Sequence, residues 1–172
     1  MNRCCILSTP VVMALGLALL SGSSAMAQQR PLKEQLIGTY TLVSVASTTR
    51  DGTKIDLFGT NPKGLITFDA GGHYAQIIVR PDRPKFKANN RLEGTPEENR
   101  AALAGGVGQF GTWSVNEADK SLSLHQEGVV HFPNEEGTDQ KRAVSLTADE
   151  LKIVIPLTGD GGRAEQVWRR AK

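Results

Sequence analysis

Most of this sequence consists of short segments in which apolar and polar residues alternate, each followed by a turn signal such as Asp51-Gly52. Alternation of period two is typical of a strand with one buried face, because successive side chains of a strand point to opposite sides. Short glycine-containing loops between such segments predict hairpins. We therefore expect an all-β, antiparallel barrel or sandwich of eight or nine strands. The expected strands are 36–47, 64–69, 73–80, 108–115, 121–127, a short further one at 129–132, 139–147, 150–157 and 164–170.

One segment departs from this alternation and predicts a single short helix. In TPEENRAALAGG (95–106), Thr95 is the expected N-cap and Pro96 the first helical residue. Glu98 stands three residues after the cap, which completes a capping box. The glycines at the end of the segment predict where the helix stops.

The first 27 residues have the composition of a secretory signal peptide. Arg3 precedes an apolar run over 11–20, and Ala25-Met26-Ala27 is the small-x-small pattern of a cleavage site. The run is shorter than the roughly 20 apolar residues that a membrane-spanning helix needs. We expect cleavage after Ala27 and a periplasmic or secreted mature domain over 28–172 without a membrane span. A mature N-terminus at Gln28 would establish this.

The expected mature chain has neither disulfides nor a strong charge. Cys4 and Cys5 both lie in the leader, so the fold depends on its own core. Of 20 Lys and Arg residues, Arg3 leaves with the leader, so 19 remain against 18 Asp and Glu residues. This balance gives no electrostatic argument for nucleic-acid binding. The length is that of one domain.

A G-x-G-x-x-G pattern at Gly106, Gly108 and Gly111 invites comparison with a dinucleotide-binding loop. In such a loop the glycines follow a strand and open a helix whose amides hold the phosphates. Here the order is reversed, because the predicted helix comes first and the alternating segment containing Trp113 comes after. The glycines are better interpreted as kinks or bulges in a curved strand.

Several short motifs, in their order along the chain, resemble the lipocalin-like domain family of bacteria, a calycin-type group of small β-barrels. The motifs are LIGTYTLVS (36–44), NPKGLITFDAGGHYAQIIVRPDRPKF (61–86), FGTWSVNEADKSLSLHQEG (110–128), FPNEEGTDQKR (132–142) and VWRR (167–170). The resemblance covers about residues 34–171. It implies an up-and-down antiparallel lipocalin-like barrel with an internal cavity, and it implies no single chemistry.

The resemblance also implies how one end of the barrel closes. In lipocalins the first strand carries G-x-W, and a late basic residue packs over that tryptophan. Tyr40 stands at the tryptophan position here, which is a departure. Trp168 with Arg170 would supply the closing pair, and the sequence leaves open whether Arg170 covers Tyr40 or Trp113.

Strand parity places two polar residues of 139–147 on the apolar side of their strand. Val144 and Leu146 face the core, so Gln140 and Arg142 share that side. A buried arginine is costly unless it is paired. Arg142 is therefore either a cavity anchor for a carboxylate or phosphate, or a structural residue satisfied by carbonyls or an acidic side chain.

The strand HYAQIIVR (73–80) leaves its orientation open. Tyr74, Gln76 and Ile78 share one face, whereas Ala75 and Ile77 share the other, more apolar one. If the first face points inward, Tyr74 and Gln76 become polar contacts in a largely apolar pocket, as in many ligand sites. The alternative is that they form a solvated outer face.

The three histidines, His73, His125 and His131, do not have the spacing of a metal site. A zinc site needs three or four converging ligands, and the mature chain offers neither cysteines nor a helical pair of histidines. His125 or His131 fits a general base, although no activated nucleophile stands beside either. We therefore expect neither a metal nor a cofactor, and we assign no catalytic residue.

These patterns favour a binding protein for a small, largely hydrophobic molecule held inside the barrel. Two alternatives stay open: an isomerase, cyclase or hydrolase acting on a hydrophobic substrate in the same cavity, and an envelope protein whose outer surface binds a partner. The expected ligand-binding residues are Tyr40, Tyr74, Gln76, Trp113, Gln140 and Arg142. The expected interior residues are Leu36, Tyr40, Leu42, Phe68, Ile78, Trp113, Leu122, Leu124, Val144, Leu146, Leu151, Ile153 and Trp168.

Overall fold

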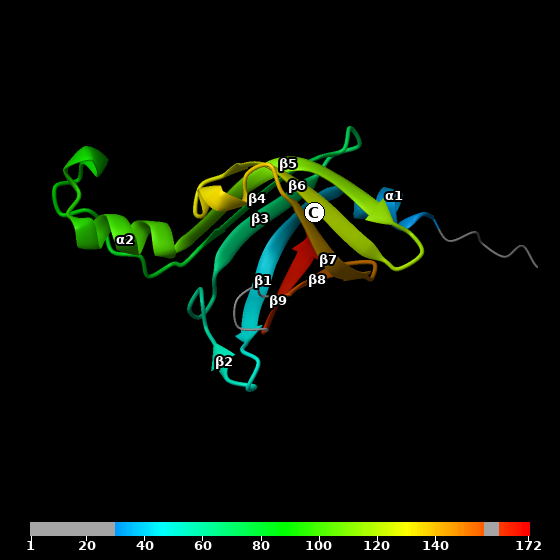
Figure 1. Cartoon of the computed structure of the whole chain (residues 1–172), viewed down its shortest axis with the longest axis horizontal. Helices are drawn as coiled ribbons and strands as arrows, with labels where there is room; N and C mark the ends of the chain where they lie inside the picture. Colours follow the sequence, from blue (N-terminus) through cyan, green and yellow to red (C-terminus); the bar gives the residue numbers. More distant parts are fainter. Residues whose placement is uncertain (1–29, 157–161) are drawn as a thin grey trace, which may run out of the picture.

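Eight antiparallel strands close into a barrel, and one further short strand extends it (Figure 1). The computed structural model describes residues 30–156 and 162–172. Around the ring, each strand pairs with the next one along the chain. The eight strands are β1 (Gly38–Thr48), β3 (Lys63–Phe68), β4 (His73–Val79), β5 (Gly106–Asn116), β6 (Ser121–Val129), β7 (Asp139–Leu146), β8 (Glu150–Pro156) and β9 (Arg163–Arg170).

The long first strand closes the ring. Residues 38–41 of β1 pair with β3, and residues 40–48 pair with β9. The register with β9 shifts between Leu42 and Ser44, as at a β-bulge, and such a bulge bends a strand. The predicted all-β, antiparallel, up-and-down barrel is therefore confirmed, and the sandwich alternative is excluded.

Some element boundaries differ from the sequence prediction. The expected strand at 129–132 does not exist as a separate element, because β6 continues to Val129 and a 3-10 turn, η2 (Pro133–Glu135), follows. Leu36 ends a helical turn, α1 (Leu32–Leu36), rather than beginning the first strand. The two-residue β2 (Lys54–Ile55) pairs with the end of β1 and is too short to show a period. The leader at 1–27 and most of the expected turn at 158–163 lie outside the described residues.

The glycine-rich pattern lies in a bent strand, as predicted. Gly106, Gly108 and Gly111 all belong to β5, and the register with β6 shifts between Phe110 and Gly111. A Cβ atom at Gly111 would collide with the backbone carbonyl oxygen of His125. Glycine is thus required where β5 and β6 approach each other at the bulge.

The core fills the end of the barrel next to α1. All thirteen interior residues predicted from strand parity are buried or pack against the buried cluster. Leu36 lies over this end and is fully buried. On β4, the inward residues are Tyr74, Gln76 and Ile78, which resolves the ambiguity of that strand.

Arg170 closes this end by covering Tyr40, and not Trp113. Its guanidinium carbon lies 4.7 Å from the centre of the Tyr40 ring. One of its terminal nitrogens donates to the carbonyl of Ile37 at 3.0 Å, and the other donates to the carbonyl of Gln35 and to the Tyr40 hydroxyl, both at 2.6 Å. Burial raises the pKa of Tyr40, and the charge of Arg170 partly opposes that shift. One arginine thus ties β9, β1 and the chain before β1 together.

Replacing Arg170 with lysine is expected to lower the free energy of unfolding by about 1–3 kcal/mol, because an ammonium cannot reach three acceptors and stack on the ring at once. Urea denaturation measures the change. Arg169→Lys is the matched control, since Arg169 is exposed on the same strand, and it should shift stability by less than about 0.5 kcal/mol. Equal effects of the two variants would contradict the closing role of Arg170.

The predicted helix stands on a long connection that projects away from the barrel (Figure 1). This connection runs from β4 to β5 and contains a 3-10 turn, η1 (Arg91–Glu93), followed by α2 (Pro96–Ala104). Both hydrogen bonds of the predicted capping box between Thr95 and Glu98 are present. None of the residues of α2 is buried, and its last turn reaches the mouth of the barrel.

Candidate functional site

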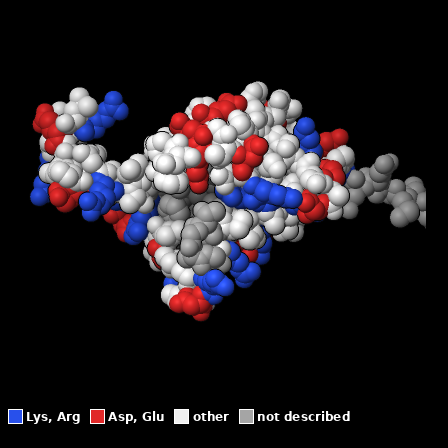
Figure 2. Space-filling model, in the orientation of Figure 1, with Lys and Arg blue, Asp and Glu red and all other residues white. Residues whose placement is uncertain are grey.

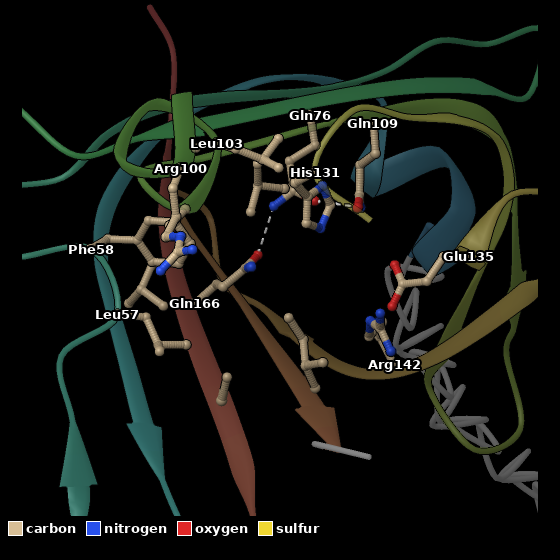
Figure 3. Close-up of a pocket in the computed structure, with 16 residues that line it drawn as sticks. Leu57, Phe58, Gln76, Arg100, Leu103, Gln109, His131, Glu135, Arg142 and Gln166 are labelled. Carbon is tan, nitrogen blue, oxygen red and sulfur yellow. Dashed lines mark hydrogen bonds between the residues drawn. The ribbon is translucent and has the colours of Figure 1, made fainter. Parts of the chain in front are cut away.

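A cavity of about 470 Å³ occupies the half of the barrel that the core leaves empty. Its walls come from the strands, from the last turn of α2, from the segment before β3 and from the β6–β7 connection (Figure 3). Ligand pockets in proteins have volumes of roughly 300–1,000 Å³, so this one accommodates a small molecule. The apolar part of the lining includes Val45, Leu57, Phe58, Leu103, Val107 and Ile155.

A chain of three glutamines lies along one wall of the cavity. Gln109 on β5 donates to the side-chain oxygen of Gln76 on β4 at 2.8 Å. Gln76 in turn donates to Gln166 on β9 at 3.0 Å, across the barrel interior (Figure 3). The oxygen of Gln166 also accepts from the indole N–H of Trp168 at 3.2 Å. Buried amides normally require such partners, so the chain fixes the shape of this wall.

Arg142 on β7 and Glu135 on η2 face each other at another side of the cavity (Figure 3). Both are half-buried. Burial lowers the pKa of Arg142, and the negative charge of Glu135 opposes that shift. The guanidinium makes one long hydrogen bond, at 3.5 Å, to the carbonyl of Lys141. Most of its donors therefore remain available toward the cavity.

His131 is the histidine that reaches the cavity. Its Nδ1 atom is buried and has no hydrogen-bond partner among the described residues. His73 and His125 lie on the surface instead, where they contact Asp69 at 3.1 Å and Asp139 at 2.9 Å. A histidine-based enzyme in this cavity would therefore depend on His131.

Of the residues expected to bind a ligand, the structure places Gln76 and Arg142 in the lining of the cavity. Tyr40, Tyr74 and Trp113 lie outside that lining, in the packed half of the barrel, where Phe68 contacts all three rings at 5.1–6.4 Å between centroids. Gln140 is half-buried outside the lining and donates to the Thr138 hydroxyl at 3.0 Å.

Tyr74 is held in the core by a hydrogen bond to a second buried polar residue. Its hydroxyl donates to Gln126 on β6 at 2.5 Å, and burial raises the pKa of Tyr74 above the ordinary range of a phenol. The amide nitrogen of Gln126 has no hydrogen-bond partner among the described residues. Tyr74 is therefore a neutral hydrogen-bond donor at physiological pH.

Among the pocket residues that the sequence did not assign to the binding site are Phe58, Gln109, His131, Glu135 and Gln166, of which His131 was considered only as a candidate general base. Gln166 had a usable signal, because it stands two residues before the inward Trp168 and shares its face. Gln109 pairs directly with Gln76, so it would have followed once the orientation of β4 was known. The other three lie outside strands, where parity gives no information.

The family model for the lipocalin-like domain matches residues 37–171, a range that includes all eight strands of the barrel. The chain belongs to the lipocalin-like domain family. The resemblance of the sequence motifs to this family is thus confirmed.

One curated relative of this lipocalin-like protein is named a 4'-hydroxy-3'-methoxypropiophenone carrier protein and comes from Aspergillus oryzae. The two are 29% identical over 102 residues, which covers 54% of this chain and 92% of the relative. A solved structure from the de novo design of a fluorescence-activating β-barrel aligns with 83% of this chain and 100% of its own, at 10% identity and a TM-score of 0.41.

Charges of both signs are interspersed over the face of the lipocalin-like barrel in Figure 2.

Within residues 30–156 and 162–172, no group of three or more histidine, cysteine or acidic side chains is arranged to hold a metal ion. The helices in the same ranges are all too short or too polar to cross a membrane.

Proposed function

We propose that this lipocalin-like protein is a carrier that binds one small, largely apolar molecule in its barrel cavity. The observation that supports the proposal most directly is the cavity of about 470 Å³, since a barrel that served only as a scaffold would gain stability from a filled interior. Apolar side chains at the mouth provide burial, and the glutamine chain with Arg142 and Glu135 provides polar contacts. This division between apolar walls and few polar groups is common in ligand sites.

The relative from Aspergillus oryzae supports the same interpretation. Its name describes a carrier of a small aromatic ketone that bears hydroxyl and methoxy groups, and the alignment covers 92% of it. We extend from that name only the class of cargo, a small molecule with an aromatic ring and polar substituents. Such a molecule matches a cavity whose lining combines apolar side chains with a few polar ones.

The export predicted from residues 1–27 is part of the proposal, although these residues lie outside the described ones. A carrier released from the cytoplasm would meet its cargo in the periplasm or outside the cell. Protein recovered from those fractions should begin at Gln28, and an intact leader on the released protein would contradict this part of the proposal.

The structure bears differently on the two alternative functions, the enzyme and the partner-binding envelope protein. An enzyme would need a general base at the cavity, and His131 lies in the cavity lining with a buried Nδ1 atom that has no hydrogen-bond partner among the described residues. A partner-binding envelope protein needs no internal space and would gain stability from a filled barrel, so the cavity argues against that alternative. Turnover of a bound molecule that is lost in His131→Phe, with binding retained, would favour the enzyme over the carrier.

Titration with a lipophilic fluorescent probe tests the proposed function. N-phenyl-1-naphthylamine should bind the purified protein saturably, one molecule per chain, with a dissociation constant in the micromolar range, which corresponds to about −8 kcal/mol. Burial of its rings in the apolar lining provides the driving force. Fluorescence that rises linearly without saturation would contradict a defined site.

A further inference from the structure

Arg142 and Glu135 form an unusual pair, because they face each other at the cavity without touching. Arg142 comes from β7 and Glu135 from η2, and both side chains are half-buried in the lining (Figure 3). Neither takes part in an ion pair within 4.0 Å among the described residues. Two opposite charges at a cavity wall thus each keep hydrogen-bonding capacity for a third group.

The glutamines on the other polar wall already use much of their hydrogen-bonding capacity on one another. The chain from Gln109 through Gln76 to Gln166 is joined by two hydrogen bonds, and Trp168 adds a third. These amides are neutral and already paired with one another. The charged donors and acceptors that remain for a ligand are therefore concentrated at Arg142 and Glu135, since Arg100 is exposed at the mouth.

The opposite charges of Arg142 and Glu135 determine which chemical group of a ligand can bind between them. A carboxylate would gain from Arg142 but would also meet the negative charge of Glu135, and like charges at short range repel strongly in a partly dry site. A hydroxyl group avoids this conflict, because its oxygen accepts a hydrogen bond and its hydrogen is donated. Hydrogen bonds to charged partners are also stronger than those between neutral groups.

We propose that the cargo is a neutral, hydroxyl-bearing apolar molecule, such as a phenol, whose hydroxyl bridges Arg142 and Glu135. Its oxygen accepts from the guanidinium of Arg142, and its hydrogen is donated to the carboxylate of Glu135. The apolar body lies against Leu57, Phe58 and Leu103. This assignment rests on the proposed carrier function, and it differs from both interpretations of Arg142 that the sequence left open, an anchor for a carboxylate or phosphate and a structural residue.

Competition between probes with one ring system tests the proposal. The probes are 2-naphthol, 2-methylnaphthalene and 2-naphthoate, each used at pH 7 to displace N-phenyl-1-naphthylamine. At this pH a phenol is neutral and a carboxylic acid is ionised. We expect 2-naphthol to bind about tenfold more tightly than 2-methylnaphthalene, because its hydroxyl gains charge-assisted hydrogen bonds, and 2-naphthoate to bind more weakly than 2-naphthol.

Two variants separate the contributions of the pair. Glu135→Gln should strengthen 2-naphthoate binding about tenfold, because the repulsion is removed, and should weaken 2-naphthol binding. Arg142→Met should weaken both 2-naphthol and 2-naphthoate about tenfold and leave 2-methylnaphthalene unchanged. Glu165→Gln and Arg169→Met, both exposed on β9, are matched controls that should change none of the three affinities.

The outcomes distinguish this inference from the carrier function. If N-phenyl-1-naphthylamine does not bind saturably, the proposed function itself fails. If it binds but 2-naphthol displaces it no better than 2-methylnaphthalene, or 2-naphthoate displaces it best, the hydroxyl assignment is overturned and the carrier function stands. A Glu135→Gln variant that leaves the preference between 2-naphthol and 2-naphthoate unchanged overturns the assignment as well.

Discussion

Replacing Trp168 with alanine is expected to lower the free energy of unfolding by about 3–5 kcal/mol, the usual loss when a large aromatic side chain is removed from a core. Trp168 is completely buried and lies between Leu42 of β1 and Leu151 of β8, at the seam where the barrel closes. Its indole N–H also donates to Gln166. A cavity at this position would weaken the packing and the closure together.

Chemical denaturation of purified protein measures this effect, and Trp168→Phe serves as the comparison. Phenylalanine retains a ring but not the N–H group, so its loss should be smaller, about 1–2 kcal/mol. Since small domains are stable by only about 5–15 kcal/mol, the alanine variant could be partly unfolded at room temperature. A loss below about 1 kcal/mol for Trp168→Ala would show that the seam does not depend on this residue.

The strands and the core followed from the sequence because one physical rule governs both. A strand with one buried face must alternate, so parity alone identified inward residues such as Leu124, Ile153 and Trp168. Parity does not distinguish a barrel from a sandwich, because both bury the same face of each strand. The family resemblance favoured the barrel, and the pairing of β1 with β9 confirms it.

The orientation of β4 was ambiguous for a reason that the structure makes clear. The outer face of this strand carries Ile77, which is 52% exposed and pairs with the exposed Leu65 of β3. The inner face carries Gln76, which is buried among other polar groups at the cavity. Apolar residues outside and polar residues inside reverse the usual rule, and such reversals are expected at functional sites.

The remaining pocket residues were beyond the reach of sequence periodicity. His131 and Glu135 belong to the β6–β7 connection, and Phe58 belongs to the segment before β3. Side chains in irregular segments have no period, so only tertiary folding places them over the barrel mouth. Only the three-dimensional structure therefore shows that Glu135 faces Arg142 at the cavity wall. The argument for a neutral hydroxyl group on the ligand depends on that arrangement.

Filling the cavity should weaken binding strongly without unfolding the protein. Val107 on β5 is a half-buried residue of the cavity lining and pairs with the inward Ile78 of β4. Val107→Trp is expected to weaken N-phenyl-1-naphthylamine binding about 100-fold, equivalent to about 2.7 kcal/mol, because the indole occupies the space of the probe. Its free energy of unfolding should change little, since the ring enters a void rather than a packed core.

The matched control places the same substitution on the outer surface. Val43 on β1 is 42% exposed and lies outside the lining of the cavity, so Val43→Trp adds the same side chain elsewhere and should leave the affinity for the probe unchanged. Circular dichroism and thermal melting establish that both variants are folded. Retained micromolar affinity in a folded Val107→Trp variant would show that the probe binds elsewhere, because the barrel cavity cannot hold the indole and the probe's two ring systems in the same place.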